Sequence, residues 1–186
     1  EVRVWLPLGH DIRSIPREGA EHKSVAYLEE SEMQAILDAV DIDSRTGVRD
    51  RALLMVLYNT GARVSEIVGL TLEDLRLHGT CAQVKLLGKG RKPRSCPLWP
   101  ETAEALEAYL HQRHPAQPVT EPVFLNANGL PITRFGIRYV TRKYGARALA
   151  PSSHKVVNPH SVRHTAAMHL LRAGNDINMV SFWLGH

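Results

Sequence analysis

The sequence is poor in cysteine and in long apolar runs, and both shortages exclude classes of protein. Its two cysteines, Cys81 and Cys96, form no Cys-x-x-Cys or Cys/His pattern, so a structural zinc site is not expected. Both fall in strand-like segments, where small thiols in a reducing compartment are expected to be buried. No apolar run approaches the roughly 20 residues of a membrane span. The charged start, residues 1–14, does not have the pattern of a signal peptide, so we expect a cytoplasmic protein without membrane contact.

Motifs for nucleotide and metal chemistry are also missing. The Gly-Lys-Gly at residues 88–90 is not a phosphate-binding P-loop, because the GxxxxGK[ST] pattern is absent. No cluster of carboxylates is available for magnesium. His160 and His164 have the helical spacing of a zinc pair, but no Glu lies between them and no third ligand is evident. We therefore expect no metal and no cofactor.

The composition is that of one ordinary domain with a mild basic bias. Hydrophobic residues make up 44% of the chain, the net charge is +4 and the pI is about 9.3. Such a charge is compatible with nucleic-acid binding but does not establish it. Residues 1–24 have scattered prolines, glycines and charges with no sustained period, and we interpret them as a linker or arm. Residues 25–186 form the domain.

The hydrophobic pattern predicts a mainly α-helical fold with a small antiparallel β-sheet or hairpin. Ser31 is a candidate cap for the first helix. Thr80 to Leu87 alternate as a strand does, Gly88–Lys92 form a hairpin tip, and Ser95–Leu98 return as a strand. Apolar residues at helical spacing indicate the helices, with one at Arg49–Asn59 that is apolar on nearly all sides and therefore central, and others at residues 31–40, 101–113, 133–148, 159–174 and 176–184.

A basic residue follows a helix break in the first half of the chain. Gly61 ends one helix, and Arg63 lies in the first turn of the next, beside free backbone N–H groups that favour an anion. Glu66, one turn later, could pair with Arg63 or support it from behind. Lys89 stands between two glycines at the hairpin tip, where a solvated turn and a functional lysine are both consistent with the pattern.

The final stretch, Pro159 to His186, carries a second basic group. His160 and Arg163 lie one turn apart on a helix, and His186 follows Gly185 after another short helix, with Ile177, Val180 and Leu184 on its buried side. Two histidines and an arginine on adjacent helices suit an anionic oxygen centre such as a phosphate.

Taken together, these residues suit metal-free phosphodiester chemistry. Two arginines can clamp the nonbridging oxygens of a phosphorane, a lysine can protonate the leaving 5′ oxygen, and a histidine can accept the proton of the nucleophile. Other basic residues are candidates for contacts with the DNA backbone, although a solvated face is the alternative; they are Arg91, Lys92, Arg134, Arg138 and Arg142.

Four motifs in order, TGARVSEIVGL, LLGKGRKPRSCPL, NPHSVRHTAAMHLLRAG and LGH, resemble the catalytic domain of the tyrosine recombinase, or phage integrase, family. The likeness covers roughly residues 25–186 and leans to integrase-like recombinases of mobile elements. It implies site-specific DNA cleavage and rejoining through a 3′-phosphotyrosine, with Glu66 as support and His164 as a packing residue. The catalytic set that it implies is Arg63, Lys89, His160, Arg163 and His186.

One departure from the family concerns the nucleophile. The family places its tyrosine shortly after the LGH histidine, whereas every tyrosine here precedes that motif, at positions 27, 58, 109, 139 and 144. We therefore expect a catalytic domain that is incomplete at its C-terminus, contains no nucleophile and does not cut DNA alone. Tyr58 and Tyr109 are expected in the core.

The resemblance also implies partners. These are double-stranded DNA, further copies of the full-length protein on that DNA, and a separate N-terminal DNA-clamping domain before residue 25, in a bacterial, nucleoid-associated protein. Two alternatives remain open at this point: a non-catalytic DNA-binding module, and a type IB topoisomerase, which shares the Arg, Lys, Arg and His chemistry.

Overall fold

The computed structural model describes residues 27–88, 90, 92–113 and 121–185. This part of the chain is mainly helical with one small antiparallel sheet, which confirms the expected fold class. None of its helices combines the length and apolar character needed to cross a membrane. The elements follow in the order α1 (Glu30–Asp38), α2 (Gly47–Thr60), α3 (Val64–Val68), η2 (Leu72–Asp74), β1 (Leu75–Arg76), β2 (Gln83–Leu87), β3 (Pro93–Pro97), α4 (Pro100–Gln112), α5 (Arg134–Ala148), η4 (Pro151–Ser153), α6 (Pro159–Arg172) and α7 (Ile177–Leu184).

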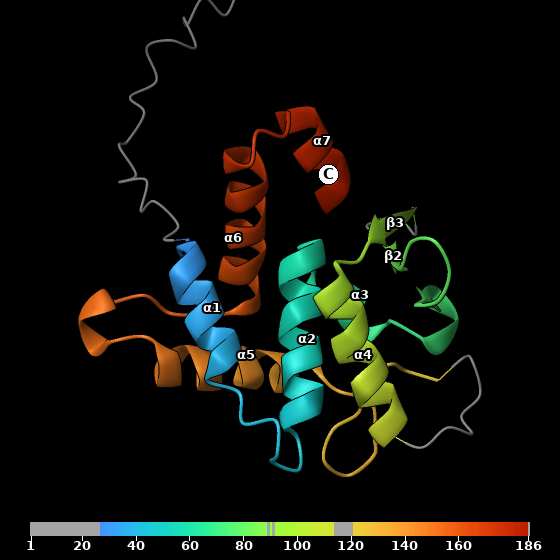
Figure 1. Cartoon of the computed structure of the whole chain (residues 1–186), viewed down its shortest axis with the longest axis horizontal. Helices are drawn as coiled ribbons and strands as arrows, with labels where there is room; N and C mark the ends of the chain where they lie inside the picture. Colours follow the sequence, from blue (N-terminus) through green and yellow to red (C-terminus); the bar gives the residue numbers. More distant parts are fainter. Residues whose placement is uncertain (1–26, 89, 91, 114–120, 186) are drawn as a thin grey trace, which may run out of the picture.

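Helix α2 lies at the centre of the domain, as its apolar sequence predicts. It packs against α4 and α6 and also contacts α1 and α5 (Figure 1). Its side chains from Ala52 to Leu57 are all buried, so the helix has no solvent-facing side over that stretch. A helix of this kind forms because tertiary packing surrounds it.

The starts of the helices are set by local hydrogen bonds. Thr133 caps α5 by accepting the N–H of Gly136 at 3.1 Å, and Asp176 caps α7 by accepting the N–H of Asn178 at 2.8 Å. The expected cap at Ser31 is wrong. Helix α1 begins one residue earlier, because the extended Glu29 is its N-cap and donates its N–H to Glu32 Oε2 at 2.7 Å.

The sheet has the order β1–β2–β3, and all its pairs are antiparallel. Strand β2 begins at Gln83, later than the predicted Thr80, because the chain turns through the left-handed Gly79 (φ 112°) before it can pair. Cys96, on β3, is buried as expected. Cys81 lies in the turn and is exposed, so its predicted burial is wrong.

Helix α7 contributes only some of its apolar residues to the core. Val180 and Leu184 are buried as predicted, whereas Ile177 is 66% exposed, contrary to the expectation. The difference arises because the first turn of α7 projects beyond α6, the helix it packs against (Figure 1).

A buried carboxylate joins α2 to α5. Asp50 is 1% exposed and accepts hydrogen bonds from the Tyr144 hydroxyl at 3.0 Å and from Arg49 Nε at 2.9 Å. The Lys143 ammonium lies 3.8 Å from the same carboxylate. A buried charge is tolerated only when it is paired and hydrogen-bonded, so this network fixes the position of α5 against the core.

The Tyr144→Phe variant should be less stable than the wild type by about 1–3 kcal/mol, because the substitution removes a charge-assisted hydrogen bond to a buried acceptor. Urea unfolding of the 186-residue chain measures this difference. Tyr139→Phe is the matched control, since Tyr139 is on the same helix but 66% exposed, and it should leave the free energy of unfolding unchanged. Equal stability of the two variants would contradict the structural role of Asp50.

Candidate active site

Arg63 is placed by the break between α2 and α3. Gly61 ends α2 in the left-handed conformation (φ 58°), and a Cβ added there would lie 2.4 Å from Leu184 Cδ2. Glycine is therefore needed both for the turn and for the close approach of α7. Arg63 follows as the N-cap of α3, with its side chain one-third exposed.

Glu66 holds the Arg63 backbone and side chain together. Its Oε2 accepts the backbone N–H of Arg63 at 2.7 Å, and its Oε1 accepts Arg63 Nη1 at 3.2 Å. The sequence allowed pairing or support from behind, and the structure has both. Burial raises the pKa of the Glu66 carboxyl, but the hydrogen bonds and positive charges of Arg94 and Arg63 outweigh burial and bring that pKa below its ordinary value.

Arg94 is a site residue that the sequence reasoning missed. It lies on β3, its side chain is 7% exposed, and its Nη1 and Nη2 donate to Glu66 Oε1 and Oε2 at 2.7 and 2.9 Å. The signal was present in the sequence, since Arg94 alternates with the inward-facing Cys96 and Leu98 and so occupies a buried strand position.

Arg163 approaches the same point from α6. It is buried, and its guanidinium donates to the backbone oxygens of Gly61 and Leu184, the latter at 2.8 Å. Burial and the positive charge of Arg63, opposed by Glu66 and reinforced by Arg94, lower the pKa of Arg163 to about 10. The residue is protonated at neutral pH, but an anion nearby would stabilise its charge.

The C-terminal end of α7 is held by all three arginines. Trp183 O accepts Arg94 Nε at 2.9 Å, Leu184 O accepts Arg163, and Gly185 O accepts Arg63 Nη2 at 3.2 Å. Carbonyls at a helix C-terminus lack partners within the helix and carry partial negative charge. The arginines satisfy these carbonyls and thereby fix the segment that leads to His186.

An open cleft of about 620 Å³ lies between the β2–β3 hairpin and α7, and the buried Arg163 is not among the described residues that line it. Arg63, Lys92, Arg94 and the exposed Phe182 line it, together with Gly88, Pro93 and Gly185. Among the described residues, the Glu66 carboxylate forms ion pairs with Arg63 and Arg94. Its negative charge also stabilises the charged form of Arg163. Basic side chains line the cleft, which is therefore suited to an anion, and Arg63, with its side chain one-third exposed, is the arginine open to it.

The other predicted residues are distributed as follows. His160 is exposed at the start of α6, one turn before the buried Arg163, and His164 packs edge-on against Tyr27 with ring centres 6.3 Å apart. Lys89, Arg91 and His186 lie outside the described residues. Their neighbours Gly88 and Gly185 both line the cleft.

The predicted backbone-contact arginines of α5 are exposed. Arg134, Arg138 and Arg142 recur every fourth residue along one side of the helix, with the exposed aromatic rings of Phe135 and Tyr139 beside them. Among the described residues they form no ion pair, so their charges are available to a partner.

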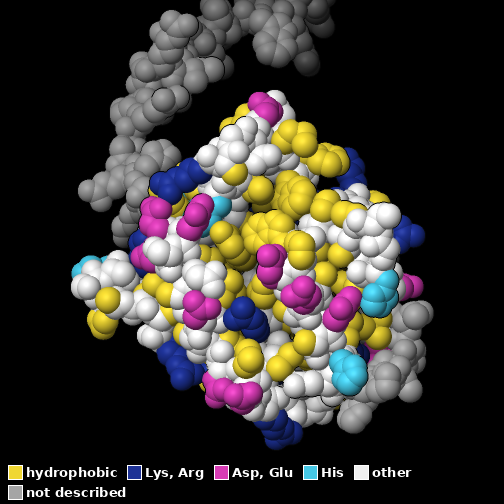
Figure 2. Space-filling view, in the orientation of Figure 1, with side chains coloured by type: hydrophobic (Ala, Val, Ile, Leu, Met, Phe, Trp, Pro, Cys, Tyr) yellow, Lys and Arg dark blue, Asp and Glu magenta, His cyan; other side chains and the backbone are white. Residues whose placement is uncertain are grey.

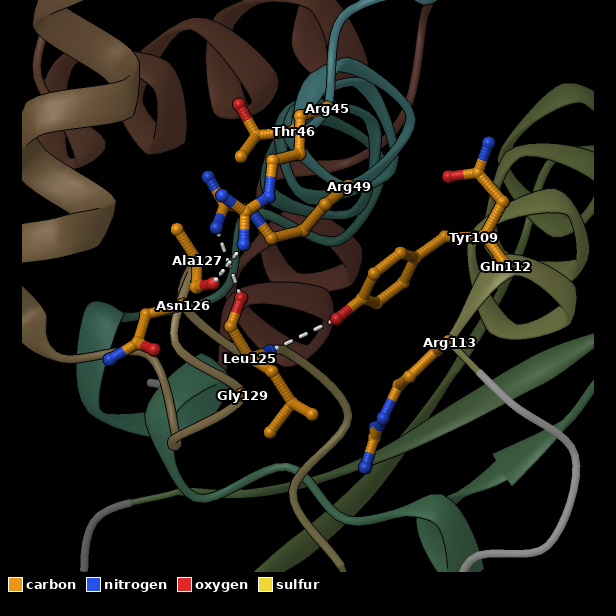
Figure 3. Close-up of a pocket in the computed structure, with 10 residues that line it drawn as sticks. All are labelled: Arg45, Thr46, Arg49, Tyr109, Gln112, Arg113, Leu125, Asn126, Ala127 and Gly129. Carbon is orange, nitrogen blue, oxygen red and sulfur yellow. Dashed lines mark hydrogen bonds between the residues drawn. The ribbon is translucent and has the colours of Figure 1, made fainter.

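Two other pockets contain none of the predicted residues. Figure 3 shows the first, of about 180 Å³, where Arg45 and Arg49 donate to the backbone oxygens of Ala127 and Leu125 and so anchor that loop. The second, a hollow of about 580 Å³ between α2 and α4, is rimmed by Asp38, Glu101 and Glu104. Acidic side chains surround the hydrophobic centre of the face in Figure 2, which makes this face unsuited to a polyanion.

None of the five tyrosines lines the cleft. Tyr109 is buried and stacks on Phe124, which confirms its core position, whereas Tyr58 is only half-buried and donates its hydroxyl hydrogen bond to His169 Nδ1 at 2.6 Å. His169 Nε2 carries the ring proton, because its partner at 2.9 Å is the carbonyl oxygen of Leu28.

Known proteins with similar sequences are recombinases. Residues 26–186 match the sequence model of the phage integrase family. The tyrosine recombinase XerC of Staphylococcus carnosus (strain TM300) is 42% identical over 161 residues, which are 86% of this chain and 53% of the relative. The tyrosine recombinase XerD of Staphylococcus epidermidis (strain ATCC 12228 / FDA PCI 1200) is 38% identical over 169 residues, covering 89% of this chain and 56% of the relative.

Solved structures agree with the sequence comparison. The crystal structure of XerA recombinase superposes with a TM-score of 0.73 at 30% identity, over 87% of this chain and 54% of that one. The fold also matches XerH site-specific recombinase bound to its difH substrate, with a TM-score of 0.73 at 24% identity, over 86% of this chain and 47% of that one. The chain thus spans about half the length of these relatives. On the sequence match and the shared fold, the chain belongs to the phage integrase family of tyrosine recombinases.

Proposed function

We propose that this chain is the strand-cleaving domain of a site-specific DNA recombinase. The observation that carries the proposal is the convergence of Arg63 and Arg163, from two distant parts of the sequence, on the C-terminus of α7 beside an open, positively charged cleft. Two guanidinium groups fixed in this way can bind the nonbridging oxygens of a scissile phosphate.

The reaction proceeds by exchange of phosphodiester bonds. A tyrosine hydroxyl attacks phosphorus, a 3′-phosphotyrosyl bond forms, and the bond to the 5′ oxygen breaks. His160 accepts the tyrosine proton, Lys89 donates a proton to the leaving oxygen, and His186 binds the phosphate beside the arginines. Attack by a 5′ hydroxyl of the partner strand reverses these steps and releases the tyrosine. In this proposal the nucleophile is a tyrosine outside residues 1–186, and the absence of the five tyrosines from the described residues that line the cleft supports it.

The surface of α5 binds the DNA backbone in this proposal. Arg134, Arg138 and Arg142 supply charge, while the acid-rimmed hollow on the face in Figure 2 turns away from the DNA. Arg91 and Lys92 add contacts from the hairpin. The full-length protein joins this domain through residues 1–24 to a DNA-clamping domain and acts as a homo-oligomer on nucleoid DNA in a bacterial cytoplasm.

Cleavage by the full-length protein tests the proposal directly. Given nicked suicide duplexes selected from a randomised library, the protein should form a covalent protein–DNA adduct without added metal. Arg63→Ala and Arg163→Lys should each lower the adduct rate by roughly 100-fold or more, because each substitution weakens the stabilisation of the phosphorane oxygens. Denaturing gels measure the adduct.

Arg76→Ala is the matched control, since Arg76 is exposed on β1 and outside the cleft, and it should react at the wild-type rate. Absence of any adduct with selected DNA would contradict the proposal and favour a binding module. Relaxation of supercoiled plasmids that lack a selected site would instead favour a topoisomerase.

The 186-residue chain alone should bind duplex DNA in a salt-dependent manner and form no adduct. Combined Arg134→Ala, Arg138→Ala and Arg142→Ala substitutions should weaken binding, because they remove positive charge from the backbone-facing side of α5. They should also reduce the slope of log K against log salt by up to about 3, or about 1 for each phosphate that is no longer neutralised. Fluorescence anisotropy over a salt series gives both quantities.

Arg147→Ala provides the control on the same helix. Arg147 is also exposed, but at about 100° per residue it lies on the opposite side of α5 from the arginine stripe. This variant should keep the wild-type slope. If Arg147→Ala lowered the DNA affinity by one third of the loss in free energy seen for the triple variant, α5 would attract DNA only through its total charge.

A further inference from the structure

Arg94 has an unusual set of contacts for a strand residue. All three nitrogens of its guanidinium are used, two on Glu66 of α3 and one on Trp183 O of α7, while its own backbone belongs to β3. One buried side chain therefore joins three elements that are far apart in the sequence.

These contacts fix both partners of the Arg63 guanidinium. Arg63 Nη1 binds Glu66 Oε1 and its Nη2 binds Gly185 O. Arg94 holds the same Glu66 Oε1 at the shorter distance of 2.7 Å, and it holds the end of α7 through Trp183 O, two residues before Gly185. Because Glu66 is engaged by Arg94, it orients Arg63 without neutralising it completely.

Arg94 also touches the residues next to the two ends of the cleft. A Cβ on Gly185 would lie 2.9 Å from Arg94 Nη1, so the guanidinium packs directly against this glycine. A Cβ on Gly88 would lie 3.7 Å from Arg94 Nη1 and 3.7 Å from Glu66 Oε1. Arg94 therefore lies close to a glycine of the hairpin and to the glycine that ends α7, and both glycines line the cleft.

We infer that Arg94 is a positioning residue for strand cleavage, which sets the geometry of Arg63 and couples the β2–β3 hairpin to the end of α7. It acts through Glu66 and the α7 carbonyl rather than on the DNA. A lysine cannot replace it, because a single ammonium cannot bridge both carboxylate oxygens and the carbonyl in one plane. The inference rests on the proposed recombinase function, but one of its two tests, a hydrogen-exchange measurement, does not depend on that function.

The first arm uses the 186-residue chain and needs no activity. In Arg94→Lys, hydrogen exchange should become faster both in the hairpin, residues 83–97, and at the end of α7, while residues of α1 keep the wild-type rate. Arg76→Lys, a substitution of an exposed arginine on the same sheet, should change neither region. If Arg94→Lys made hydrogen exchange faster in the hairpin alone and left the end of α7 unchanged, the inferred coupling between these two elements would be wrong.

The second arm uses the full-length protein and single-turnover cleavage at saturating DNA. Arg94→Lys should lower the cleavage rate by roughly 100-fold, as small misplacements of catalytic groups do, while the dissociation constant for DNA changes by less than about threefold. A wild-type rate for Arg94→Lys would overturn the inference. So would a loss of affinity with an unchanged rate, since Arg94 would then be a DNA contact.

A double substitution separates positioning from instability. Arg94→Met with Glu66→Gln removes the buried pair together and leaves no carboxylate without Arg94, so it should fold better than Arg94→Met alone. Its loss of cleavage rate should be smaller than the product of the losses in Arg94→Met and Glu66→Gln alone, because Arg94 acts partly through Glu66. Multiplicative losses would mean that they act independently. If the wild type itself forms no adduct, the proposed function fails. The hydrogen-exchange measurement still tests whether Arg94 couples the β2–β3 hairpin to the end of α7.

Discussion

The Glu66 carboxylate, shared between Arg94 and Arg63, is the interaction on which the site depends. The Arg94 guanidinium donates to both carboxylate oxygens, at 2.7 and 2.9 Å. The Arg63 guanidinium donates to only one of them, Oε1, at the longer distance of 3.2 Å. This asymmetry gives the two arginines different tasks. Arg94 is buried and fully engaged, while Arg63 is oriented and keeps its side chain one-third exposed, on the lining of the cleft. A symmetric arrangement would neutralise the group that has to meet the phosphate.

The helix dipole of α7 supplies the rest of the local charge balance. Three carbonyls at its C-terminus receive hydrogen bonds from Arg94, Arg163 and Arg63, so the arginines repel one another less than their separation alone would imply. Burial, and after it the positive charge of Arg63, still lower the pKa of Arg163 to about 10. An anion beside Arg163 would stabilise its charged form.

Much of the fold, and part of the site, follows from local sequence patterns. The hairpin and the stop at Gly61 depend on residues that are adjacent in the sequence, and the central helix is recognised because it is apolar on nearly all sides. Burial of Cys81 and Ile177 was predicted wrongly, because it depends on where the turn at Gly79 and the end of α6 lie in space. Arg94 was missed for the same reason, since its partners Glu66 and Trp183 are non-local and only its inward strand position marks it. The roles of His160 and the other catalytic candidates stay predictions.

The central claim is that Arg63 and Arg163 bind the scissile phosphate while Arg94 holds the structure behind them. The most direct measurement is the Nε–Hε NMR spectrum of the arginines during titration of the 186-residue chain with duplex DNA at moderate salt. We predict that the Arg63 and Arg163 resonances shift in a saturable way and that the Arg94 resonance stays nearly unchanged. Saturable DNA binding that leaves Arg63 and Arg163 unaffected would contradict the account.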